Sequence, residues 1–150
     1  AWVAGTFGVG ILYPLLKLIF AHYITCTVHL IIVYGGILML LAKVRVAPFF
    51  KGMTDAMTLA ASTTSSSACL PATLHCVEEN LGVSKNIASF VLPLGSTINM
   101  NGTAIFQGIA AVFISQAYGI ELGWQSLLVI VVTATLSAVG CAGIPGGGLV

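Results

Sequence analysis

A polar segment, Pro93-Leu94-Gly95-Ser96-Thr97-Ile98-Asn99-Met100-Asn101-Gly102-Thr103, interrupts an otherwise apolar part of this sequence. The apolar runs on either side, residues 87–92 and 104–117, are together long enough to cross a bilayer, which takes about 20 apolar residues. In hydrocarbon every backbone polar group needs a partner, so a broken helix is stable only where it lines an enclosed or wet cavity. A polar, glycine-containing break at this depth is typical of a binding site in a secondary transporter.

The composition indicates an integral membrane protein. Of the 150 residues, 58% are hydrophobic and only 6% are charged, whereas soluble domains carry about 25% charged residues. The net charge of +1 argues against a nucleic-acid partner. The four cysteines lie in or beside apolar runs without metal-ligand spacing, so we expect reduced core residues rather than a structural disulfide.

The long apolar run at residues 13–42 predicts a tilted spanning helix. Within it, His22 and His29 share one helical face with Cys26 between them. A metal or proton site is one interpretation, but a packed histidine pair is preferred, because two helical turns are a poor spacing for sharing one ion. Residues 43–51 then hold three of the five basic residues, so the positive-inside rule places this loop in the cytoplasm.

Residues 54–79 do not fit a simple spanning helix. The segments 54–61 and 72–77 are each too short to cross the bilayer, and the serine-rich segment 62–71 lies between them and ends at a proline. Two short arms around a polar tip predict a re-entrant hairpin that enters and leaves by the cytoplasmic side. The alternative is a serine-rich loop outside the membrane, which the lack of glycine and charge in the tip disfavours.

A second arm and tip follow the broken helix. Trp124 begins an apolar arm at an expected membrane interface, and residues 138–148 combine many glycines with Pro145, which no uninterrupted helix tolerates. Residues 68–71 and 142–145 share the pattern Ala-x-aliphatic-Pro. Two related hairpins of opposite orientation are what an inverted-topology repeat predicts.

Three motifs in this order resemble the sodium-coupled dicarboxylate/amino-acid symporter family, which includes archaeal aspartate transporters and excitatory amino-acid transporters. They are the runs Ser65-Ser66-Ser67-Ala68-Cys69-Leu70-Pro71, Asn99-Met100-Asn101-Gly102-Thr103 and Gly140-Cys141-Ala142-Gly143-Ile144-Pro145-Gly146. The resemblance covers residues 13–150. It implies a multi-pass plasma (inner) membrane homotrimer in which each protomer moves a substrate-carrying domain past a fixed scaffold, elevator fashion.

The resemblance also implies which residues bind the transported molecule, a dicarboxylate or an amino acid. The first tip would contribute Thr64, Ser65 and Ser66, partly through backbone groups. Thr103 would offer its hydroxyl and the positive end of the second half-helix. The gate that covers the site would consist of Ile144, Pro145, Gly146, Gly147 and Gly148.

The coupling ion implied by the resemblance is Na⁺, with H⁺ as the alternative, and no other cofactor is expected. The carbonyl of Gly95 and the side chain of Asn99 match one sodium site, and Asn101 matches the position of another. A further site matches four residues, largely through backbone oxygens, which hard cations prefer: Thr97, Ala138, Val139 and Cys141.

Several positions depart from the family pattern. Asn101 replaces an aspartate, which removes a negative charge and predicts a weaker third sodium site or a different stoichiometry. Thr64 stands where some prokaryotic members have an arginine, and Cys141 replaces a commoner threonine or alanine. We expect the sequence to be a fragment of a longer protein, since the family's final helix, which reads the substrate amine and side chain, would follow Val150.

The sequence leaves two alternative functions open. An intramembrane serine hydrolase would use Ser65, Ser66 or Ser67 as nucleophile and His75 as base, but the sequence lacks a Gly-x-Ser-x-Gly turn. A non-transporting truncated fragment is the other alternative for the chain taken alone.

The sequence therefore predicts an all-α integral membrane fold with re-entrant hairpins and a broken transmembrane helix. Its expected division is the end of one helix, a spanning helix and a basic loop (1–51), hairpin 1 (52–86), the broken helix (87–118) and the first arm and tip of hairpin 2 (119–150).

Overall fold

The computed structural model describes residue 10 and residues 12–149, and this part of the chain is helical without strands. The all-α prediction is confirmed. The helix end expected in residues 1–12 falls almost wholly outside the described residues. The elements are α2 (Leu12–His29), η2 (Leu30–Tyr34), α3 (Gly35–Leu40), α4 (Val46–Gly52), α5 (Thr54–Thr63), α6 (Ser66–His75), η3 (Cys76–Asn80), α7 (Lys85–Ile98), α8 (Asn101–Ala117), α9 (Trp124–Val139) and η4 (Gly147–Leu149).

Within the described residues, two helical stretches are long and apolar enough to cross a membrane. The first is Leu12–Leu40, 29 residues, in which α2, η2 and α3 run on without a break. The second is Lys85–Ala117, 33 residues, which contains α7 and α8. About 20 apolar residues are needed to span the hydrocarbon core, so both stretches are long enough to cross it at a tilt.

The helices approach one another through small side chains. The buried apolar residues in the described part of the chain are all alanine or cysteine, and the large apolar side chains point outward along α2 and α9. Close packing through small residues is typical of helices in lipid, where large apolar groups gain nothing by leaving the hydrocarbon. The buried set is Ala56, Cys76, Ala88, Ala134, Ala138 and Cys141.

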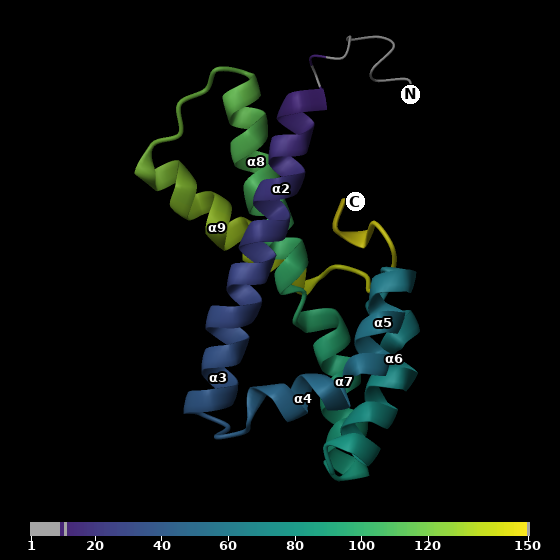
Figure 1. Ribbon diagram of the computed structural model, residues 1–150. Helices are drawn as coiled ribbons and strands as arrows, with labels where there is room; N and C mark the ends of the chain where they lie inside the picture. The colour runs from purple at the N-terminus through teal and green to yellow at the C-terminus, as the bar shows by residue number, and fades with distance from the viewer. Residues whose placement is uncertain (1–9, 11, 150) are drawn as a thin grey trace.

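Two helical arms approach the middle of the molecule from opposite ends. In Figure 1, α4 crosses one end of the molecule and leads into α5, which packs beside α6. The turn between α8 and α9 lies at the other end, and α9 returns from it along α8. The yellow segment after α9 then reaches the tip between α5 and α6. The sequence predicted opposite orientations for these two arms.

The first tip is shorter than predicted. Only Thr64 and Ser65 separate α5 from α6, whereas a tip over residues 62–71 was expected, and Pro71 lies inside α6. Ser65 explains the early helix start, because its Oγ accepts a hydrogen bond from the backbone N–H of Ala68 at 3.2 Å, which caps α6. Thr64 has a φ of +51°, a left-handed conformation that is strained for a β-branched residue.

The break in the central helix is also shorter than predicted. The unwound residues are Asn99 and Met100, and Pro93 lies inside α7. The hydroxyl of Ser96 donates to the carbonyl oxygen of Pro93 at 2.7 Å, and Thr97 bonds to its own helix in the same way. The polar residues before Asn99 therefore satisfy their hydroxyls without unwinding the helix.

Candidate functional site

The two tips meet at the carbonyl group of Gly143. This oxygen accepts hydrogen bonds from Ser65 Oγ at 2.7 Å and from the backbone N–H of Ser67 at 3.0 Å. Ser65 is only 8% exposed. A Cβ on Gly143 would lie 2.6 Å from Ser67 Oγ and 3.3 Å from the carbonyl oxygen of Ser96, so the contact requires glycine. The first tip, the second tip and the end of α7 thus converge on one residue.

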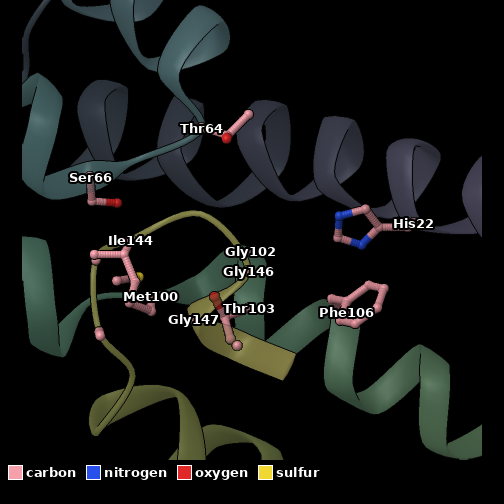
Figure 2. A pocket seen from close by; sticks show the side chains of 13 residues that line it. His22, Thr64, Ser66, Met100, Gly102, Thr103, Phe106, Ile144, Gly146 and Gly147 are labelled. Atoms are coloured by element: carbon pink, nitrogen blue, oxygen red, sulfur yellow. The ribbon is translucent and has the colours of Figure 1, made fainter. Parts of the chain in front are cut away.

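A cavity of about 350 Å³ opens beside this contact. Figure 2 shows Thr64 and Ser66 of the first tip on one side of it and Thr103 with the second tip opposite. The volume falls in the range of about 300–1,000 Å³ that is common for small-molecule sites. The lining residues are His22, Thr64, Ser66, Met100, Gly102, Thr103, Phe106, Ala142, Gly143, Ile144, Gly146, Gly147 and Gly148.

Most of the predicted substrate residues line this cavity, but two do not. Ser65 and Pro145 are absent from the lining, and the hydroxyl of Ser65 instead donates to the carbonyl oxygen of Gly143. The seven predicted residues that do line it are Thr64, Ser66, Thr103, Ile144, Gly146, Gly147 and Gly148. Their role in binding a substrate remains a prediction.

The second tip packs directly on the start of α8. A Cβ on Gly148 would clash with the side chain of Thr103, and one on Gly147 would clash with the carbonyl oxygen of Ala142. Gly146 has a φ of +75°, which also favours glycine. The run of glycines therefore allows the tip backbone to approach the cavity closely.

Three residues at this site were not predicted to be there: Phe106 and Gln107 were not singled out in the sequence, and His22 was expected in a packed pair with His29 or a metal or proton site. His22 and Phe106 line the cavity with ring centroids 5.6 Å apart and planes at 88°, as Figure 2 shows. Gln107 Nε2 donates to the carbonyl oxygen of Gly148 at 3.0 Å and to Ser137 Oγ at 3.3 Å, which ties the second tip to α8 and α9. Its buried Oε1 has no hydrogen-bond partner. A polar residue inside an apolar run was the only signal for His22 or Gln107.

The described residues that line the cavity include no aspartate, glutamate, lysine or arginine. Its polar groups are hydroxyls, backbone groups and the His22 ring. Gly102 and Thr103 belong to the first turn of α8, where N–H groups lack helical acceptors and the helix dipole is positive. Such a helix start favours an anionic group, such as a carboxylate, without a basic side chain.

A second cavity, of about 410 Å³, adjoins the first and shares four lining residues with it: Ser66, Met100, Gly102 and Thr103. Asn99 and Asn101 line it together with residues of the first spanning stretch, including His29 and Tyr34. Asn101 Nδ2 donates to Tyr34 Oη at 2.7 Å and lies 3.4 Å from His29 Nε2. His22 lines the first cavity and His29 the second, so the two histidines face different spaces.

The remaining candidate sodium ligands lie around the ends of α7 and α9. The carbonyl of Gly95 accepts the N–H of Asn99 at 3.0 Å, and that of Ala138 accepts the N–H of Cys141 at 3.3 Å. Each of these oxygens keeps a second lone pair for a cation. Five of the seven candidate sodium ligands line neither cavity: Gly95, Thr97, Ala138, Val139 and Cys141.

Comparison with known proteins identifies the family to which the chain belongs. Residues 1–150 match the model of the "Sodium:dicarboxylate symporter family". The chain belongs to the sodium:dicarboxylate symporter family. It is 44% identical over 123 residues to human excitatory amino acid transporter 1, and these residues make up 82% of the chain and 23% of that relative.

Other members of the sodium:dicarboxylate symporter family are equally similar. Human neutral amino acid transporter A is 44% identical over 133 residues, which cover 89% of the chain and 25% of that relative. A putative sodium-dependent excitatory amino acid transporter of Caenorhabditis elegans is 43% identical over 123 residues, or 82% of the chain and 25% of the relative. The chain therefore spans about a quarter of the length of these curated relatives.

Membership of this symporter family makes the chain part of a membrane transporter family and not an enzyme. The geometry agrees, because the hydrolase alternative would need His75 beside one of the tip serines. Ser66 and His75 are the first and last residues of α6, and a rise of about 1.5 Å per residue separates them by roughly 13 Å. That distance is far beyond hydrogen-bond reach.

Proposed function

We propose that the complete protein is a secondary active symporter that takes up an amino acid or a dicarboxylate together with Na⁺. The observation that carries this proposal is the contact of both tips at Gly143 beside a cavity at the start of α8. A small cavity between two opposed arms is suited to access from either side in turn. The names of the relatives, which transport excitatory or neutral amino acids, support the same class of substrate.

In this proposal the substrate carboxylate lies at the start of α8. The free N–H groups of the first turn and the hydroxyl of Thr103 donate to it, while Thr64 and Ser66 approach from the first tip. The second tip, Ile144–Gly148, acts as the gate. A hydrogen bond from Gln107 to the carbonyl oxygen of Gly148 ties this gate to α8.

Sodium is proposed to bind around the break, where backbone carbonyls and amide oxygens concentrate. Gly95 with Asn99 forms one site, and Thr97 with the carbonyls that end α9 (Ala138, Val139 and Cys141) forms another. These ions would hold the end of α7 and the second tip in the arrangement that binds substrate. H⁺ is the alternative coupling ion.

The complete protein is proposed to work as a homotrimer in the plasma (inner) membrane, crossing it several times. Each protomer would move the part described here past a fixed scaffold in an elevator mechanism, and the two arms would enter the bilayer as re-entrant hairpins. The apolar outward faces of α2 and α9 suit lipid or further helices. The alternative for these 150 residues taken alone is a segment that does not transport.

Sodium replacement in proteoliposomes tests this function. We expect uptake of a labelled acidic or neutral amino acid by the complete protein to fall at least tenfold when external Na⁺ is replaced by choline, because empty cation sites leave the gate unsupported. A protonophore in sodium buffer serves as the control and should have little effect. Uptake that persists in choline and is lost with the protonophore would contradict sodium coupling and assign H⁺ as the coupling ion.

A further inference from the structure

The corner between α3 and α4 concentrates positive charge beside exposed apolar side chains. Lys43, Arg45 and Lys51 are three of the five basic residues of the chain, and the first acidic residue is Asp55. All three basic residues are exposed. Neither the substrate cavity nor the proposed sodium sites involve this corner.

Backbone hydrogen bonds hold this corner in one conformation. The N–H of Val44 donates to the carbonyl of Leu38 at 2.9 Å, and Lys43 has a φ of +51°, which together close α3 with a left-handed C-terminal turn. Arg45 follows in an extended conformation and immediately precedes α4. Lys43 and Arg45 are thus fixed on either side of a tight turn.

A shallow depression of about 640 Å³ lies at this turn. Its walls combine the two cations with apolar groups, and the end of α3 beside it exposes 79% of Leu40 and 77% of Leu41. Figure 1 shows α4 running across the end of the long apolar helix rather than continuing it. The lining residues are Met39, Lys43, Val44, Arg45, Val46, Ala47 and Pro48.

We propose that this corner binds the headgroup of an anionic phospholipid. A phosphate is matched by the bidentate guanidinium of Arg45 and the point charge of Lys43. The exposed end of α3 and the apolar wall of the depression match the acyl chains of the same molecule. The proposal does not depend on the transported substrate or on the coupling ion.

The acidic groups near α4 lie toward its other end. The helix packs against η3, which carries Glu78 and Glu79, and Asn80 Nδ2 donates to the carbonyl of Gly52 at 2.7 Å. Gly52 is the last residue of α4, whereas Arg45 precedes its first. The negative charges therefore face the Lys51 end of α4, and Lys43 with Arg45 carries the lipid contact.

The test uses the complete protein in nanodiscs with mixed phosphatidylglycerol and phosphatidylcholine, and native mass spectrometry counts the lipids retained. A basic residue near a charged membrane surface contributes about 1 kcal/mol, or roughly a fivefold change in binding. We therefore expect the double variant Lys43→Gln/Arg45→Gln to lower phosphatidylglycerol retention about 25-fold, by multiplying two fivefold effects, with phosphatidylcholine unchanged. The control Lys17→Gln/Lys85→Gln removes the same charge elsewhere and should retain lipid.

A charge-preserving variant, Lys43→Arg/Arg45→Lys, separates loss of charge from loss of folding and should keep most of the bound phosphatidylglycerol. Equal retention by the neutral double variant and the unaltered protein would overturn the proposal. Loss of retention in both the neutral and the charge-preserving variants would also overturn it, because charge would not be the cause. Displacement of the lipid by an equal concentration of inorganic phosphate would assign the corner to free anions instead.

Discussion

Replacing Gly143 by alanine is expected to lower uptake by the complete protein about fivefold or more. The new methyl group would lie 2.6 Å from Ser67 Oγ, 3.2 Å from the backbone nitrogen of Ser67 and 3.3 Å from the carbonyl oxygen of Ser96. Rotation of the serine side chain removes only the first conflict, because the other two atoms belong to backbone. Overpacking of this kind costs about 1–3 kcal/mol, and about 1.4 kcal/mol changes a population tenfold.

The measurement is initial uptake in proteoliposomes, corrected for the amount of folded protein. Gly140→Ala is the matched control, because its added methyl would meet nothing nearer than the Ser137 carbonyl at 3.8 Å, an ordinary contact. Gly140→Ala should transport normally. Normal transport by Gly143→Ala as well would mean that the two tips need not touch for uptake.

Replacing Asn101 by aspartate is expected to make the protein depend more steeply on sodium. Asn101 Nδ2 donates to Tyr34 Oη at 2.7 Å, so the change removes a donor and adds a negative charge in a half-buried site. Without a bound cation, that charge should lower stability by about 1–3 kcal/mol. With sodium bound, the same charge strengthens cation binding.

Two measurements test this effect. The first is uptake as a function of sodium concentration, and the second is the unfolding temperature with and without sodium. The variant should reach half-maximal uptake at a lower sodium concentration and should gain more thermal stability from sodium than the unaltered protein does. Asn86→Asp adds the same charge to the exposed first turn of α7 and serves as the control. Identical sodium curves for Asn101→Asp and the unaltered protein would exclude Asn101 from any cation site.

The sequence predicted the types of secondary-structure element more accurately than the residues at which they begin and end. Composition and apolar runs were enough to predict an all-helical membrane chain with two interrupted regions. The predicted helix ends were wrong where serine, threonine and proline were taken as helix breakers. Ser65 instead caps α6, Thr97 bonds back to its own helix, and Pro71 and Pro93 are accommodated inside helices.

The residues that line the cavity were predictable only in part. Thr64, Ser66 and Thr103 belong to motifs that are recognisable in sequence, and the structure brings them to one space. The position of His22 depends on how α2 packs against α8, and no local pattern encodes that packing. The bond from Gln107 to Gly148 likewise depends on where the second tip comes to rest.

The central claim, that the second tip closes over the bound substrate, is tested most directly by cysteine labelling. Ile144 lines the cavity and is 59% exposed, whereas Ile120 lies in the turn before α9 and is 57% exposed, which makes it a matched control. The rate of maleimide labelling is measured for Ile144→Cys and Ile120→Cys in the complete protein, against the background of its native cysteines. Sodium and substrate together should slow labelling at position 144 at least fivefold and leave position 120 unchanged. An unchanged rate at position 144 under saturating sodium and substrate would contradict the account.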